Sequence, residues 1–130
     1  MFDKVDYWLE LCDEDIVAAK TMLKARNFLW MGFICHLIAE KALKAVVADI
    51  TEEIPPKTHD LPRLATIANV RPALSTQQLK LLNDLTPLQI EARYPEHKAK
   101  IAATLTLQRS EELMKETEVF VCWIKNWLGK

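Results

Sequence analysis

Apolar residues recur at steps of three and four along most of the chain, which is the pattern of helices with one buried face. In the first such run, acidic residues lie near the start and basic residues near the end, as the helix dipole favours. Its apolar positions are Val5, Trp8, Leu9, Cys12, Ile16, Ala19 and Leu23. The pattern therefore predicts a first amphipathic helix over residues 3–26, with a break at Asn27.

Residues 28–50, FLWMGFICHLIAEKALKAVVADI, are apolar around most of a helix circumference. A helix of this kind is expected in the middle of a bundle or at a subunit interface, because an outer helix of a monomer would show a broad polar face. This composition is one argument for a homodimer.

The polar residues of this second helix form one narrow strip. His36, Glu40 and Lys44 follow at four-residue steps and share an edge, with Lys41 beside them. One interpretation is a solvated edge with an ordinary Glu40–Lys44 pair. The other is a functional strip that faces a groove or a partner, in which Lys41 and Lys44 bind phosphate.

The second half of the chain shows clearer breaks. Residues 51–62, TEEIPPKTHDLP, predict a loop because two prolines cannot continue a helix, and Asp60 can cap the next helix over residues 61–68. Ser75 with Gln78 three residues later predicts a capping box and a further helix. Thr86-Pro87 then predicts a restart as a short turn carrying residues 90–93.

The last periodic run begins near residue 104 and ends at Gly129, and residues 96–104 carry no clear pattern. No segment alternates with period two, and the chain has only 2 glycines. With 130 residues and 50% hydrophobic composition, the chain is large enough for one core. We therefore expect a single all-α domain over residues 1–130, a bundle of four to five helices.

The net charge and the distribution of apolar residues argue against several classes of protein. The 17 basic and 18 acidic residues give a net charge of −1, which argues against binding to duplex DNA. The N-terminus does not resemble a secretion signal, and no apolar run approaches the roughly 20 residues of a membrane span. We expect a cytoplasmic protein without membrane attachment.

The cysteines and histidines predict no metal site and no cofactor. Cys12, Cys35 and Cys122 lie far apart within helical patterns, as reduced core or near-core thiols would. No histidine lies at ligand spacing from another histidine or cysteine on a defined helix pair. A glycine-rich phosphate loop is also missing from the sequence.

The stretch EARYPEHK, residues 91–98, contains the strongest candidates for chemistry. Pro95 disfavours helical geometry at Tyr94, so a helix should end near Arg93 and place its side chain at a terminus. In one interpretation, Arg93 caps carbonyls, Tyr94 packs on a neighbouring helix and His97 is exposed. In the others, Arg93 contacts a nucleotide phosphate or a partner, or Arg93 and His97 together cleave RNA.

His59 has two interpretations as well. It stands among the helix-entry residues Thr58 and Asp60, where it can simply bond a loop carbonyl. Alternatively, it contacts a phosphate or a base.

Three stretches in order carry a resemblance to a known family. AEKALKAVV at 39–47, PPKTHDLPRL at 55–64 and DLTPLQIEARYP at 84–95 resemble the HEPN family, the higher eukaryote and prokaryote nucleotide-binding domain. The resemblance covers essentially the whole chain. It implies an antiparallel up-and-down bundle that forms a homodimer, binds a nucleotide or RNA, and assembles with a minimal nucleotidyltransferase as in toxin–antitoxin pairs.

Some branches of the family are metal-independent endoribonucleases in which an Arg and a His meet across the dimer. The resemblance therefore implies Arg93 and His97 as catalytic residues, and Glu40, Lys41, Lys44, His59 and Tyr94 as ligand- or partner-binding residues. Three residues separate Arg93 from His97, fewer than in the ribonuclease branches.

Overall fold

The computed structural model describes residues 3–91 and 95–130, and for residues 90–97 it describes no side chains. Within these residues the secondary structure is helical, without a strand, which confirms the all-α class. The elements are α1 (Lys4–Lys24), α2 (Phe28–Ile50), α3 (Leu61–Ile67), the 3₁₀ helix η1 (Arg71–Ala73), α4 (Thr76–Glu91), α5 (Pro95–Thr104) and α6 (Leu107–Trp127).

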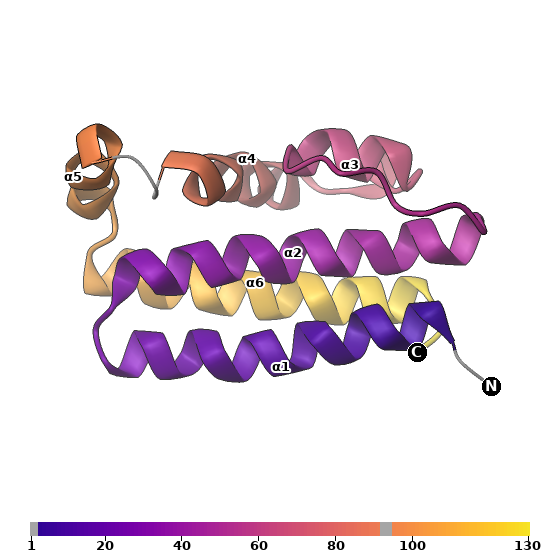
Figure 1. Ribbon diagram of the computed structural model, residues 1–130, viewed down its shortest axis with the longest axis horizontal. Helices are drawn as coiled ribbons and strands as arrows, with labels where there is room; N and C mark the ends of the chain where they lie inside the picture. Colours follow the sequence, from indigo (N-terminus) through magenta and orange to yellow (C-terminus); the bar gives the residue numbers. More distant parts are fainter. Residues whose placement is uncertain (1–2, 92–94) are drawn as a thin grey trace.

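The helices form an up-and-down bundle around α2. Figure 1 shows α1, α2 and α6 lying lengthwise side by side, α3 and α4 along another side of α2, and α5 at one end. The direction of the chain alternates through α1, α2, α4 and α6. Helix α2 contacts each of the other α-helices, which confirms that its apolar circumference belongs in the middle of the bundle.

This burial removes one argument for a dimer. The large apolar side chains Met31, Ile38 and Leu43 of α2 are fully buried within the single chain. Since one chain already covers these residues, the composition of α2 does not require a second subunit.

Helix ends follow the local signals in the sequence. The Asn27 side chain accepts a hydrogen bond from the backbone N–H of Trp30 at 3.4 Å, and Asp60 caps α3 in the same way. The capping box at α4 is confirmed, because Ser75 Oγ accepts from the Gln78 N–H at 3.1 Å and Gln78 Oε1 accepts from the Ser75 N–H at 2.8 Å.

Two local expectations were wrong or incomplete. Helix α4 continues through Pro87 instead of restarting there. The hydroxyl of Thr86 donates to the Leu82 carbonyl at 2.8 Å and accepts from the Leu61 N–H at 3.3 Å, so α3 holds this turn in place. Residues 96–104, which had no assignment, belong to α5, which has Pro95 at its first position, and the described residues therefore contain six α-helices instead of four to five.

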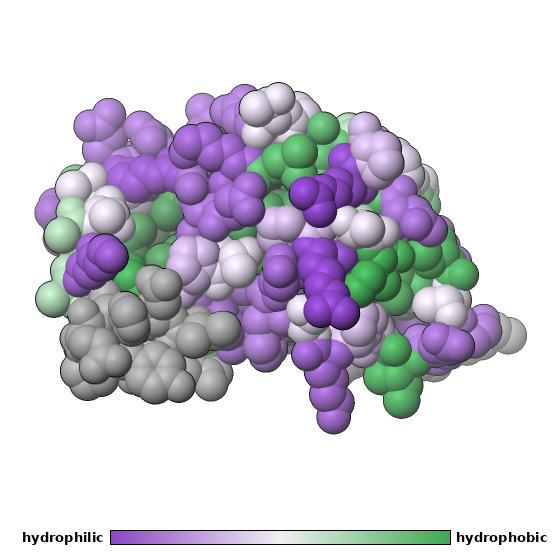
Figure 2. Space-filling view, turned by 90° about the horizontal axis from the view of Figure 1, so that it is seen from above, coloured by the Kyte–Doolittle hydropathy of each residue, from purple (hydrophilic) through white to green (hydrophobic). Residues whose placement is uncertain are grey.

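The surface over α3 and α4 is mixed in character. Figure 2 looks down on this side and shows hydrophilic residues over much of it, with most of the hydrophobic surface in the half that holds α3. Among the described residues, none of the helices combines the length and apolar character that crossing a bilayer requires.

Candidate functional site

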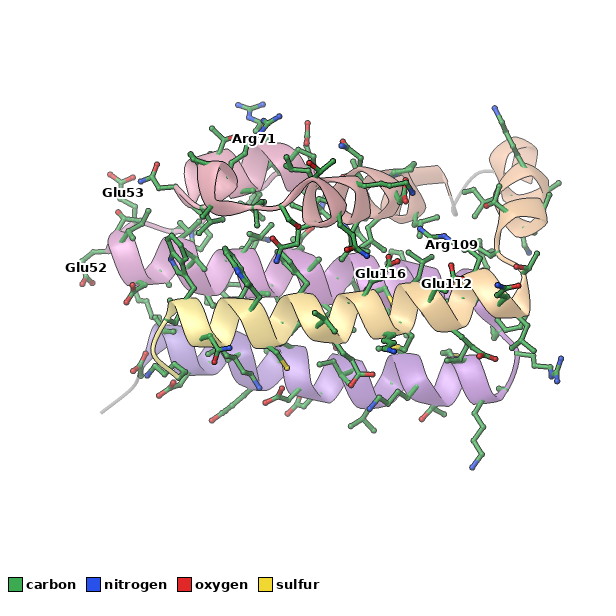
Figure 3. All side chains as sticks on the ribbon, turned by 180° about the vertical axis from the view of Figure 1, so that it is seen from behind. Glu52, Glu53, Arg71, Arg109, Glu112 and Glu116 are labelled. Atoms are coloured by element: carbon green, nitrogen blue, oxygen red, sulfur yellow. The ribbon has the colours of Figure 1, made fainter. Side chains whose placement is uncertain are left out.

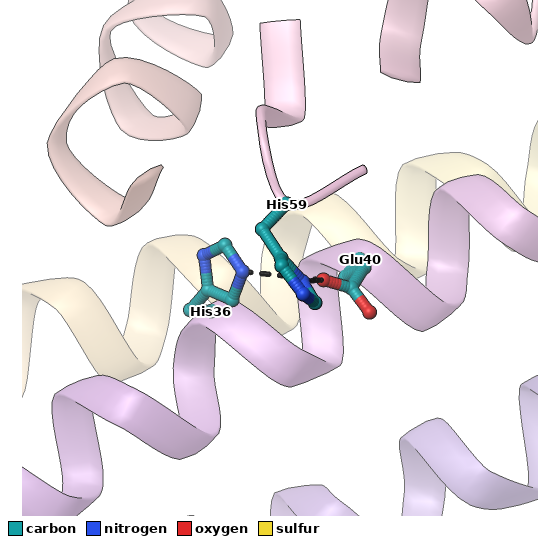
Figure 4. A group of neighbouring side chains, drawn as sticks. All are labelled: His36, Glu40 and His59. Atoms are coloured by element: carbon teal, nitrogen blue, oxygen red, sulfur yellow. Dashed lines mark hydrogen bonds and ion pairs between the residues drawn. The ribbon is translucent and has the colours of Figure 1, made fainter. Parts of the chain in front are cut away.

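Two histidines and a glutamate meet where the loop after α2 folds back over that helix. His36 and Glu40 lie one turn apart on α2, and His59 comes from the loop before α3 (Figure 4). Glu40 Oε1 lies 3.3 Å from His36 Nε2 and 2.7 Å from His59 Nδ1. One atom from each of the three side chains lies within 4.8 Å of the other two. We call these residues the His–Glu–His cluster.

The carboxylate at the centre of the cluster stays ionised. Burial acts to raise the pKa of Glu40, but hydrogen bonds from His36, His59 and Lys44 outweigh it and lower the pKa to about 2. Lys44 Nζ binds the other oxygen, Oε2, at 2.9 Å and also lies 5.6 Å from the centre of the Trp8 ring. Glu40 is therefore an acceptor at both oxygens at neutral pH.

Both ring nitrogens of His36 face acceptors. Nδ1 lies 3.2 Å from the backbone carbonyl of Leu85 on α4, and Nε2 faces the carboxylate of Glu40. The ring is fully buried, so water cannot replace either partner. The contact to Leu85 fixes the orientation of the ring across the α2–α4 interface.

The strip on α2 is not a solvated edge, because His36 and Glu40 are buried. His36, Glu40 and Lys44 share one edge of α2, as the sequence predicts. Their polar atoms form hydrogen bonds and ion pairs with other groups of the same chain. His59 bonds a carboxylate here and not a loop carbonyl. The spacing of His36 and Glu40 was visible in the sequence, whereas the arrival of His59 from a loop was not.

Lys41 lies outside the cluster. Its Nζ binds Asp15 Oδ2 on α1 at 2.6 Å, so it ties α2 to α1. Since Lys41 and Lys44 are both paired with carboxylates, a phosphate would have to compete with these partners. Phosphate binding by the two lysines stays a prediction.

Of the residues from the stretch 91–98, Arg93 and Tyr94 lie outside the described residues, and so does the side chain of His97. Helix α4 ends at Glu91 and α5 begins at Pro95, so the position of His97 falls within the first turn of α5. The catalytic role of Arg93 and His97 and the binding role of Tyr94 therefore stay predictions.

A groove between α4 and α6 was not predicted from the sequence. It has a volume of about 710 Å³, and its apolar lining includes Leu74, Leu81, Val119, Phe120 and Trp123. Val119 is 59% exposed, although it lies on a helix whose other face is core. The helical period of α6 places Val119 away from the core face. An apolar residue at such a position was the one sign in the sequence of an exposed apolar surface on this helix.

Glu112 and Glu116 line one wall of this groove, and Arg109 lies beside them. Figure 3 shows Arg109, Glu112 and Glu116 on α6, on the side turned toward α4. Arg109 binds Asp84 of α4 at 2.8 Å and approaches Glu112 and Glu116 at 3.5 and 3.6 Å. Arg109 thus joins the two helices near the groove.

Comparison with known proteins places the chain in a family. The sequence pattern of the HEPN domain matches residues 5–127, which is nearly the whole chain. The protein belongs to the HEPN domain family. Curated proteins gave no match. The crystal structure of TT1696 from Thermus thermophilus has the same fold, with a TM-score of 0.80 at 18% sequence identity, over 96% of this chain and 98% of TT1696.

Membership confirms the family suggested by the three sequence stretches, and it makes the chain a helical module of a nucleotide- and RNA-related family. The likeness to TT1696 concerns the fold, because 18% identity is too low to transfer a function.

Proposed function

We propose that this HEPN domain is a homodimeric interaction module that pairs with a minimal nucleotidyltransferase, in the manner of a toxin–antitoxin system, and associates with a nucleotide or RNA. The observation that carries the proposal is the family match across residues 5–127. The resemblance of the sequence to this family is the basis for the nucleotidyltransferase partner and the dimer.

The groove between α4 and α6 is the surface on which we expect the nucleotidyltransferase to dock. It offers apolar side chains such as Val119 and Trp123, with Glu112, Lys115 and Glu116 beside them. A hollow with an apolar floor and a charged rim suits a partner helix that carries apolar anchors flanked by charges. We assign this groove to the nucleotidyltransferase and leave the dimer to another face.

The test first asks whether the adjacent reading frame encodes a small nucleotidyltransferase, and then combines that protein with the purified chain. We expect sedimentation equilibrium to give the mass of a dimer, and calorimetry to detect a complex with the nucleotidyltransferase. Val119→Glu should weaken that complex at least about tenfold, because it buries a charge in an apolar contact. Val17→Glu is the matched control, since Val17 is a comparably exposed valine on α1, 66% against 59%.

Failure to bind the nucleotidyltransferase at micromolar concentrations would overturn the partner, and a monomer mass would overturn the dimer. Equal weakening by Val119→Glu and Val17→Glu would keep the partner but remove the groove as its docking surface.

The second candidate is a metal-independent ribonuclease with a composite site of Arg93 and His97 at the dimer interface. The start of α5 at Pro95 is the observation that favours it, because it puts the backbone of His97 at the beginning of a helix close in sequence to Arg93. Arg93→Ala and His97→Ala should each abolish RNA cleavage while the dimer mass stays unchanged. RNA left intact by highly purified wild type would exclude this activity.

A further inference from the structure

The His36 ring of the His–Glu–His cluster faces two acceptors, whereas a neutral imidazole has one N–H group to donate. His36 Nδ1 faces the Leu85 carbonyl and His36 Nε2 faces the Glu40 carboxylate, and both groups can only accept hydrogen bonds. A neutral imidazole carries a single N–H, so it satisfies one of these partners and leaves the other facing a lone pair. A metal ion between Nε2 and Oε1 would satisfy both the ring nitrogen and the carboxylate.

The donor set is that of a transition-metal site. If Nδ1–H of His36 donates to the Leu85 carbonyl, Nε2 presents its lone pair to Glu40, and an imidazole bonded to a carbonyl in this way is the usual arrangement of a metal ligand. Glu40 offers Oε1, because Lys44 takes Oε2. His59 adds a second nitrogen through Nδ1. Two imidazoles and one carboxylate oxygen suit zinc.

Two of the three distances between ligand atoms can be compared with those around such an ion, and the third, between the two imidazole nitrogens, is within 4.8 Å. Two ligands of a tetrahedral zinc ion, each at about 2.0–2.1 Å from it, lie roughly 3.3 Å apart. His36 Nε2 and Glu40 Oε1 are separated by 3.3 Å. The 2.7 Å between Glu40 Oε1 and His59 Nδ1 is shorter, so His59 would have to withdraw by a fraction of an ångström. His59 is free to do so, because its side chain is 47% exposed and lies on a loop.

From this geometry we propose that His36 Nε2, Glu40 Oε1 and His59 Nδ1 bind one zinc ion, with the fourth position open to solvent beside His59. The site was not visible in the sequence, because His59 lies 19 residues from Glu40 and joins it only through the fold. It shares no residue with the groove or with residues 91–98, so it does not depend on the proposed function.

The ion would fasten the loop between α2 and α3 to the middle of the bundle. His36 and Glu40 are held by α2, while His59 is the contribution of the loop. Binding to the folded state alone would raise the unfolding temperature as the zinc concentration rises.

The experiment is a titration of the metal-stripped protein at neutral pH with Zn²⁺ by calorimetry and with Co²⁺ by visible absorption. We expect one ion per chain and the intense Co²⁺ bands of a four-coordinate site. His59→Ala and Glu40→Gln should each weaken binding at least about tenfold, since loss even of a supporting contact costs 10–100-fold. His59→Ala removes a half-exposed loop side chain, and circular dichroism will check that the variant is folded.

Cys122→Ser is the control, because it removes an exposed possible zinc ligand on α6, outside the cluster, and should leave zinc affinity unchanged. Equal affinity of wild type, His59→Ala and Glu40→Gln would overturn the proposal and identify binding elsewhere on the surface. The absence of any bound ion in wild type would also overturn it.

Discussion

At the scale of single residues, the ionised carboxylate of Glu40 links the position of a loop to the interior of the bundle. Lys44 reaches it from the next turn of α2, whereas His59 reaches it from outside the helix. A buried carboxylate is tolerated only with such donors, because an unpaired one would cost several kcal/mol. The loop conformation at His59 is therefore coupled to the charge inside α2.

The three thiols should differ sharply in reactivity. Burial raises the pKa of Cys12 to about 12, and Asp13 and Asp15 act in the same direction. Burial also raises the pKa of Cys35 to about 12. Because the thiolate is the reactive form, both should stay inert near pH 8, while the exposed Cys122 reacts.

We expect iodoacetamide to modify one thiol per folded chain and all three after unfolding, as read by mass spectrometry. Cys122→Ser should abolish labelling of the folded protein. Labelling of Cys12 at the rate of Cys122 would mean that α1 separates from α2 in the native state, and labelling of Cys35 at that rate would mean that α2 separates from α6, where Thr117 lies beside this thiol.

At the scale of elements, helix ends were readable wherever the signal was local. Ser75 with Gln78, Asp60 and Gly129 each act within a few residues, so the sequence located these ends. The turn at Pro87 was misread because the contact that stabilises it, from Leu61 to Thr86, comes from α3, 25 residues away in the sequence. Helix α5 was missed because its residues lack a clear apolar period.

The capping box of α4 should carry a measurable share of stability. Ser75→Ala removes the acceptor for the Gln78 N–H, and loss of such a cap costs about 1 kcal/mol. We expect urea unfolding to show this loss with an unchanged slope. Ser75→Asp keeps an acceptor at the helix start and should retain most of the stability. If both variants lost the same free energy of unfolding, the Ser75 hydroxyl would not stabilise the helix as a cap.

At the scale of the whole molecule, the sequence predicted the bundle and part of the site. The four-residue spacing of His36, Glu40 and Lys44 is a property of one helix and was visible. The addition of His59 and the hollow between α4 and α6 depend on how separate elements pack, which periodicity does not encode. The resemblance favours Arg93 and His97 as the catalytic pair. Arg93 lies outside the described residues, and so does the side chain of His97.

The packing of α4 against α6 should depend on salt through Arg109. Its guanidinium binds Asp84 across the two helices and lies near Glu112 and Glu116, while its side chain is 27% exposed. Arg109→Ala should lower the free energy of unfolding by about 1 kcal/mol at low ionic strength, and by less in high salt, because partly exposed ion pairs are screened. Lys20→Ala is the control, since the pair of Lys20 with Glu118 is more exposed and should contribute less.

A loss of stability from Arg109→Ala that did not change with salt would show that the arginine stem holds the helices together by packing. In that case, the charged wall of the groove would be free to meet a partner without weakening the bundle.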